Sequence, residues 1–291
     1  MIRNLLTLLV GSVLFQSCME SDPPIVFTDN ATLLVDTVYT TASVPDAQDV
    51  AIVVEDLTGV RCSSCPKAAK AAKTIKEQYG ERVVVIGNYP TEPKNLTTPV
   101  SGYEDLRTDQ AQLIATNVYG FSNQLPGGGV NRKVFDGQTR INTNFNTWGN
   151  AASQLVSLKS VVNIDVEKKQ TSDSTFEIKG VFSFTGTPSF DPFVSVFLLE
   201  DGIKHPQTIE DGSQDKEYSH KHVVREMYTP YNGTPLLKAI DPSAERGVVV
   251  EKSWAVTIPS NVNVSNASLV IMVNQNDASN KEVLQCKEVK L

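Results

Sequence analysis

Hydrophobic residues in the first half of the chain fall in short continuous runs separated by helix-like segments. Residues 51–54 and 83–86 are apolar and β-branched, which is typical of strands covered on both faces. Between them, residues 64–79 carry alanines among lysines and end before Gly80, a pattern that favours a helix. Because a helix connects the two strands, we expect them to lie parallel in one sheet.

The same kind of pattern continues to about residue 158. We expect a helix around 106–118, a strand over 130–135 that follows Pro126, and a closing helix over 145–158. Strands and helices thus alternate along this part of the chain. Residues 46–158 are therefore predicted to form an α/β domain.

The pattern changes from residue 161 onward, where apolar and polar residues alternate with a period of two. The alternation is clear over 162–166 and 176–184, and the runs are separated by Gly, Pro, Asn and Asp. Residues 159–291 are therefore predicted to form a second, antiparallel all-β domain that resembles a β-sandwich. Further strands are expected at 194–199, 222–227, 248–258, 269–273 and 283–289.

Residues 1–17 have the form of a signal peptide. A positive start is followed by an apolar run over residues 5–15, which is shorter than the roughly 20 residues that a membrane-spanning helix needs. Ser17-Cys18 at the end of this run resembles a lipobox. The resemblance implies that Cys18 is lipidated and anchors the chain to a membrane. Ordinary cleavage nearby is the alternative.

Residues 18–45 are predicted to be a linker with one short strand at 33–39. Glu20 and Asp22 lie directly after Cys18, and this position resembles the signal that exports some bacterial lipoproteins to the cell surface. A flexible tether of polar residues is the alternative. We therefore expect the folded part to face either the periplasm or the cell surface.

Charge narrows the range of partners. The formal net charge of the 291-residue chain is -7, whereas nucleic-acid binding depends mainly on Lys and Arg that neutralise phosphates. Nucleic acid is therefore excluded as an expected partner.

Two of the four cysteines, Cys62 and Cys65, form a C-x-x-C motif between a predicted strand and a predicted helix. The N-terminus of a helix stabilises a thiolate, so we expect Cys62 to be the attacking sulfur and Cys65, one turn further along, to resolve the mixed disulfide. Two alternatives stay open: a disulfide that only braces the loop, and a metal site completed by two other ligands.

Around this motif the chain resembles the thioredoxin superfamily. The resemblance implies that Asp56, six residues before Cys62, is a buried carboxylate that carries the proton of Cys65. It also implies that Pro126 is a cis-proline that faces the disulfide and orients the substrate backbone. The alternative for Asp56 is that, with Glu55, it marks the strand end and faces water. Arg61 and the flexible loop expected at 127–129 depart from the thioredoxin pattern.

The remaining candidate residues favour structural roles. Cys286 lies in the last predicted strand, where a cysteine is usually a small buried hydrophobe. His220 and His222 alternate, so on one strand they would share a face and could hold Zn or Cu, but a polar seam between the domains is the preferred interpretation. We predict no metal and no other cofactor.

Over residues 45–291 the chain also resembles the outer-membrane-protein-28 family of bacterial lipoproteins, which join a thioredoxin-like half to a β-rich half. The resemblance implies attachment to the outer membrane and has a loose link to adhesion. It rests on the order and spacing of several segments rather than on any single one. These segments are 54–59, 62–66, 125–127, 130–132, 222–225 and 282–285.

Two functions are compatible with these patterns. In the first, an outer-membrane lipoprotein anchored by Cys18 exchanges disulfides with exported proteins or peptides. In the second, the β-rich half makes a noncatalytic surface or adhesion contact, and Cys62 and Cys65 form a structural disulfide.

Overall fold

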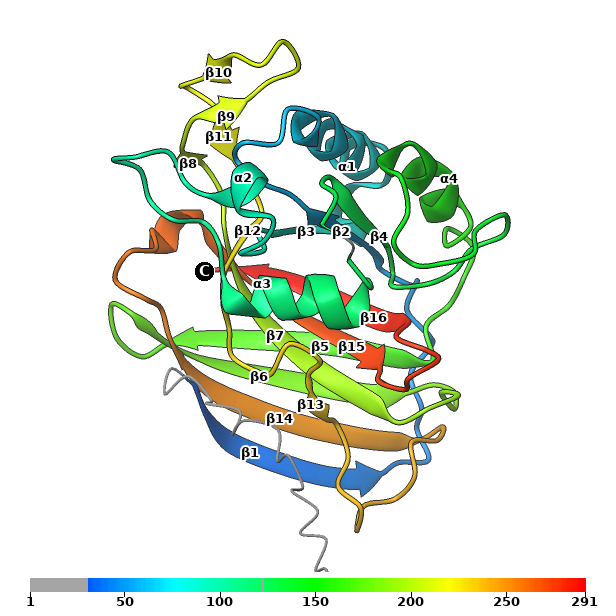
Figure 1. The fold of residues 1–291 in the computed structure, drawn as a ribbon. Coiled ribbons are helices and arrows are strands. Elements are labelled where there is room, and N and C mark those ends of the chain that lie inside the picture. The colour runs from blue at the N-terminus through cyan, green and yellow to red at the C-terminus, as the bar shows by residue number, and fades with distance from the viewer. Residues whose placement is uncertain (1–30, 122) are drawn as a thin grey trace, which may run out of the picture.

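The computed structural model describes residues 31–121 and 123–291 (Figure 1), so the predicted signal peptide and Cys18 lie outside the described residues. Within the described ranges, no helix combines the length and the apolar character that a membrane span requires. The described part is mostly β-structure, arranged as two large sheets with a few helices on one of them.

The predicted strand-helix-strand unit is confirmed. Strand β2 (Ile52–Leu57) lies parallel to β3 (Val83–Asn88), and α1 (Cys65–Tyr79) connects them. Every residue of both strands is buried, as expected for strands covered on two faces. The short η1 (Gly80–Arg82) follows α1.

An eight-stranded sheet extends from this unit into the C-terminal half of the chain. Strand β12 lies parallel to β3, with Val223 opposite Gly87, and the remaining strands follow in the order β7, β15 and β16. Residues on both sides of the predicted domain boundary, between residues 158 and 159, therefore share one sheet. The division into two domains stays a prediction. The strands are β7 (Pro192–Glu200), β12 (Val223–Met227), β13 (Thr234–Pro235), β15 (Ala267–Gln275) and β16 (Val283–Lys290).

A second sheet of four antiparallel strands packs against the first. Its strand order is β1, β14, β6 and β5, and Phe182 and Trp254 pack with Val196 and Leu269 of the larger sheet. The predicted strand at 33–39 is confirmed, within a region predicted to be a linker. The strands are β1 (Ala31–Thr40), β5 (Val162–Gln170), β6 (Thr175–Phe184) and β14 (Val248–Thr257).

Helices cover both faces of β2 and β3. On one face α1 packs with η3 (Phe145–Thr147) and α4 (Trp148–Ser153). On the other, α3 (Asp109–Leu113) continues into η2 (Ile114–Val118) and runs beside β16 (Figure 1). The predicted helix over 106–118 is confirmed from residue 109 onward. The short α2 (Lys94–Thr97) and η4 (Val264–Asn266) lie in loops.

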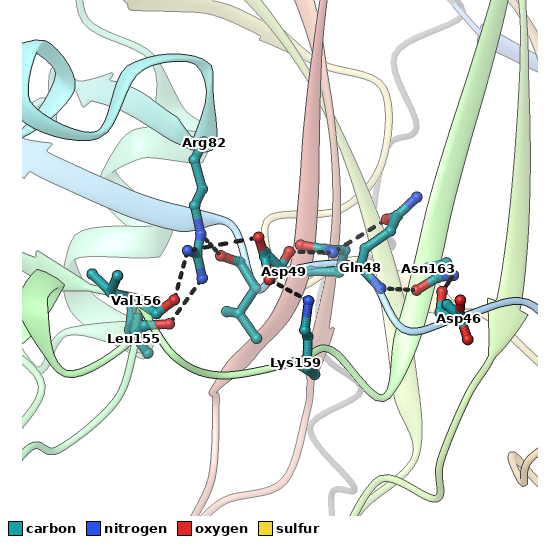
Figure 2. A network of polar contacts seen from close by, with 10 residues as sticks. Asp46, Gln48, Asp49, Arg82, Leu155, Val156, Lys159 and Asn163 are labelled. Carbon is teal, nitrogen blue, oxygen red and sulfur yellow. Dashed lines mark hydrogen bonds and ion pairs between the residues drawn. The ribbon is translucent and has the colours of Figure 1, made fainter.

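The predicted helix over 145–158 is too long, because α4 ends at Ser153. The backbone carbonyls that follow bind Arg82 instead (Figure 2). Its Nη2 donates to Leu155 O at 2.9 Å and its Nη1 donates to Val156 O at 2.7 Å. Nε of the same guanidinium donates to Val50 O at 2.8 Å, so Arg82 joins this turn to the segment before β2.

The strand predicted over 130–135 lies elsewhere. Strand β4 is Gly127–Val130, and Asn131 and Arg132 have φ values of 48° and 47°, which end the strand in a left-handed turn. The amide side chain of Asn131 takes over the pairing with β2: its Oδ1 accepts from Val53 N at 2.7 Å and its Nδ2 donates to Ala51 O at 2.9 Å.

The prediction of a flexible loop at 127–129 is wrong, because these glycines are buried in β4. Gly128 has a φ of +123°, and a Cβ at this position would lie 2.0 Å from Glu55 O. A Cβ on Gly129 would lie 2.3 Å from Ile141 O. The glycines therefore permit close approach of backbones, which is a rigid role.

Candidate functional site

The C-x-x-C motif lies where the sequence predicts it, in the turn between β2 and α1. A disulfide joins Cys62 to Cys65, the first residue of α1. Ser64 is the N-cap residue and Pro66 occupies the first turn, where its missing N–H leaves no helical hydrogen bond unmade. Strand end, turn and helix start thus fix both sulfurs at the carboxyl edge of the sheet.

Both cysteines are buried: the side chains of Cys62 and Cys65 are 2% and 1% exposed. Residues 203–220, which we call the cover segment, cross the turn between β2 and α1. Gln207 Nε2 donates to Cys62 O at 2.9 Å, and Thr208 N donates to Val60 O at 2.9 Å. The cover segment and the burial of Cys62 therefore close the approach of a partner to this sulfur in the described structure.

The cover segment consists of four very short strands. Their two-residue lengths give no readable periodicity, so sequence reasoning missed the segment. The cover segment also contacts α1, because its Glu210 forms an exposed ion pair with Lys67. The strands are β8 (Ile203–Lys204), β9 (Gln207–Thr208), β10 (Gln214–Asp215) and β11 (Ser219–His220).

Asp56 lies beneath α1. Side chains alternate along β2, so Glu55 and Leu57 point to the opposite face. Asp56 is 5% exposed and its Oδ1 has no hydrogen-bond partner among the described residues. Burial raises the pKa of Asp56 to about 8, so the carboxyl holds a proton at neutral pH. The alternative in which Asp56 and Glu55 face water is wrong.

Asp56 and Cys65 line the same pocket, which we call the α1 pocket. It has a volume of about 560 Å³ and lies between α1 and residues 218–222. Its walls also include Tyr89 and Gly87. A Cβ on Gly87 would lie 3.0 Å from His222 O. The pocket is a route from the surface to the protonated carboxyl and to the second cysteine.

The histidines do not share a strand face. His220 ends β11, whereas His222 has a φ of 55° and pairs with Asp201, with 3.4 Å between Nδ1 and Oδ1. Among the described residues, no group of three or more His, Cys, Asp or Glu side chains could hold a metal ion. The shared-face geometry of the metal alternative is therefore wrong.

His220, the last residue of the cover segment, belongs to a neutral hydrogen-bonded chain that joins this segment to Tyr89. Its Nε2 donates to His205 O at 3.0 Å, so its Nδ1 accepts from Tyr89 OH at 2.8 Å. In turn, His205 Nε2 accepts from Val100 N at 3.3 Å. Burial lowers the pKa of His220 to about 4, which keeps its ring uncharged at neutral pH.

Pro126 lies at the start of β4, beside the turn that carries the cysteines. The Leu125–Pro126 peptide bond is cis, as predicted. The next residue, Gly127, pairs with Leu57 at the end of β2, and a Cβ on Gly59 would lie 3.0 Å from Leu125 Cδ1.

Cys286 is buried and free on β16, as predicted. Burial raises the pKa of its thiol far above the ordinary value, so it stays protonated.

Sequence reasoning missed a buried ion pair on the other face of β2. Glu55 and Arg132 are each 1% exposed; Arg132 Nε donates to Glu55 Oε2 at 2.6 Å and Nη2 donates to Oε1 at 2.9 Å. Tyr119 OH also donates to Glu55 Oε2, at 2.7 Å. The available signal was a glutamate inside an otherwise apolar strand, which requires a buried partner.

Comparison with known proteins places the chain in a family. HBP35 of Porphyromonas gingivalis has a similar fold, with a TM-score of 0.62 at 14% identity over 84% of this chain and 76% of that one. A domain of the outer membrane lipoprotein Omp28 from Porphyromonas gingivalis gives a TM-score of 0.30 at 19% identity over 45% of this chain and 88% of that one. A search of curated proteins finds no match.

The family model described as outer membrane protein Omp28 matches residues 114–291, which is more than half of the chain. The resemblance to this family drawn from the sequence is therefore confirmed over residues 114–291, and the chain belongs to the Omp28 family of outer membrane proteins.

Proposed function

We propose that this protein is anchored to the outer membrane by lipid on Cys18 and exchanges disulfides with exported proteins or peptides through Cys62 and Cys65. Residues 46–158 would act as a thioredoxin-like domain and residues 159–291 as a β-sandwich-like one. The parallel β2–α1–β3 unit with the motif at its helix start, and cis-Pro126 at the start of β4, support this proposal.

The observation that carries the proposal is the protonated carboxyl of Asp56, which lines the same pocket as Cys65 and whose buried Oδ1 has no hydrogen-bond partner among the described residues. In the reductive direction, a partner thiolate attacks Cys62 Sγ, the Cys62–Cys65 bond breaks, and its electron pair leaves on Cys65 Sγ. Asp56 then gives its proton to the Cys65 thiolate. The oxidative direction is the reverse, with Asp56 taking the proton from Cys65.

A trapping experiment tests this chemistry. In Cys65→Ser the mixed disulfide on Cys62 is not resolved, so we expect partner proteins to stay bound to Cys62 through a bond that reductant breaks. The full chain is expressed in its own envelope, and adducts are identified by nonreducing gels and mass spectrometry. A variant with both Cys62→Ser and Cys65→Ser is the control and should give no adducts.

The burial of both sulfurs favours a second candidate, a noncatalytic surface-binding or adhesion lipoprotein with a structural disulfide. The reduction potential separates the two. An exchange protein should have a potential above about -300 mV, whereas a structural disulfide lies below that value. A reduction potential below about -300 mV, together with no partner protein bound to Cys62 in Cys65→Ser, would overturn the exchange proposal.

Exchange also requires the cover segment to leave the turn. We expect Gln207→Ala to speed reduction of the disulfide by excess dithiothreitol about tenfold, because hydrogen bonds contribute about 0.5–1.5 kcal/mol each and Gln207 Nε2 donates to two carbonyl oxygens of the turn, those of Gly59 and Cys62. The appearance of thiols is followed without denaturant. Gln214→Ala, on the exposed β10, is the matched control. Equal rates in both variants would mean that the cover segment does not limit access.

A further inference from the structure

A second pocket, of about 400 Å³, lies on the face of β2 opposite Asp56, and we call it the arginine pocket. Its lining residues come from the end of η2, from the segment after β4 and from the turn between β15 and β16. None of the residues proposed for disulfide exchange lines it. The lining residues are Asn117, Val118, Arg132, Lys133, Val134, Ile141, Ala278, Ser279, Asn280, Lys281 and Glu282.

Arg132 lines this pocket and carries a buried donor that no described residue uses. Its Nε and Nη2 hold Glu55, whereas Nη1 is buried and has no hydrogen-bond partner. A guanidinium cannot lose its proton in a protein, so the N–H groups on Nη1 remain donors under all conditions. A buried donor without an acceptor destabilises the folded protein, and an acceptor from outside would remove that cost.

The charges that line the pocket favour an anion. Three cationic side chains, from Arg132, Lys133 and Lys281, line it together with one carboxylate, Glu282, which Lys133 holds at 2.5 Å. The pKa of Lys281 is lowered, mainly because of burial and also because of the charge on Arg132, although Asp277 acts in the opposite direction. An anion between Arg132 and Lys281 would relieve this repulsion.

We propose that the arginine pocket binds a small organic carboxylate. The N–H groups on Nη1, which Glu55 does not occupy, can form charge-assisted hydrogen bonds with a carboxylate. The Lys281 ammonium supplies a second charge, and the Asn117, Asn280 and Ser279 side chains can hydrogen-bond polar substituents of the ligand. The volume of about 400 Å³ lies within the range of ligand pockets and exceeds the need of a single ion.

The carboxylate can come from a free acid or from the C-terminus of a peptide. Binding of succinate, of trialanine with a free C-terminus, of trialanine amide and of inorganic phosphate is measured on the full chain by calorimetry. We expect saturable binding of at least one of the two carboxylate probes and none of trialanine amide. Binding of succinate alone would identify the ligand as a free acid. Binding of trialanine would identify it as the C-terminus of a peptide. Binding of phosphate alone, or of no probe, would overturn the proposal.

Two variants tie the binding to this pocket. Lys281→Gln should lower the affinity for the carboxylate about tenfold, because it removes one charge without disturbing the buried Glu55–Arg132 pair. Lys287→Gln, on an exposed position of β16, is the matched control and should bind as the parent does. Equal affinity in all three proteins would place the ligand elsewhere. The variant with both Cys62→Ser and Cys65→Ser should bind normally, so the outcome is independent of disulfide exchange.

Discussion

Replacement of Arg132 by methionine is expected to lower the free energy of unfolding by about 3–5 kcal/mol, because it leaves the Glu55 carboxylate buried without its counter-charge. Glu55 is 1% exposed, and its two oxygens accept from Nε and Nη2 of Arg132. In the variant, the Tyr119 hydroxyl at 2.7 Å is the remaining side-chain donor to this carboxylate. Unfolding in urea, monitored by circular dichroism, measures the change.

Two further variants separate the cost of an unpaired charge from loss of packing. With Glu55→Leu added to Arg132→Met, both charges are removed and most of the lost stability should return, because apolar groups of similar size often replace a buried pair at no cost. Lys133→Met breaks a half-buried ion pair with Glu282 and should cost at most about 1 kcal/mol. A loss below 1 kcal/mol for Arg132→Met would contradict the assigned role of this pair.

The β2–α1–β3 unit could be predicted because its signals are local. Two β-branched runs flank one alanine-rich helix, so the crossover rule alone gives their parallel order. By contrast, the continuation of the sheet through β12 depends on the pairing of Val223 with Gly87, which lies far away in the sequence. No short-range pattern specifies that pairing. The alternation in the second half predicted antiparallel strands without revealing that some of them extend the first sheet.

Within the candidate site, residues with a local signal were placed correctly and the residues that cover them were missed. The resemblance to thioredoxins around the C-x-x-C motif implied that Asp56 is a buried carboxylate and Pro126 a cis-proline, and the structure has both. Gln207, which donates a hydrogen bond to Cys62 O, lies 145 positions away in the sequence. The hydrophobic residues around it show neither the period of a strand nor that of a helix. Similarly, the left-handed turn at Arg132 arises from the Asn131 side chain, whose bonds to β2 are tertiary.

Asp56→Asn is expected to be more stable than the parent at high pH, and the difference should grow by about 1.4 kcal/mol for each pH unit between pH 4 and pH 8. The pKa of Asp56 is raised from 3.8 to about 8, so between these values the folded protein keeps a proton that the unfolded chain has lost. Stability from Asp56 is therefore full below pH 3.8 and is lost as the pH rises through 8. Summed over the interval, the effect is roughly 6 kcal/mol.

The difference between variant and parent is the quantity to measure, because His220 masks the effect in the parent alone. The pKa of His220 is lowered from 6.5 to about 4, so between these values the unfolded chain binds the extra proton. Stability from His220 therefore rises with pH over the interval in which stability from Asp56 falls. The free energy of unfolding of the parent should therefore change little with pH up to about pH 6.5 and should decline from there to pH 8.

Urea unfolding of oxidised parent and Asp56→Asn across pH 4 to 9 gives this difference directly. Asp173→Asn, in the exposed turn between β5 and β6, measures the effect of removing one surface carboxylate. In the exchange proposal, the rate of disulfide reduction should also change near pH 8 in the parent, and this change should be absent in Asp56→Asn. A stability difference that stays constant with pH would mean that Asp56 ionises as it does in the unfolded chain, and the proposed proton transfer to Cys65 would then lose its source.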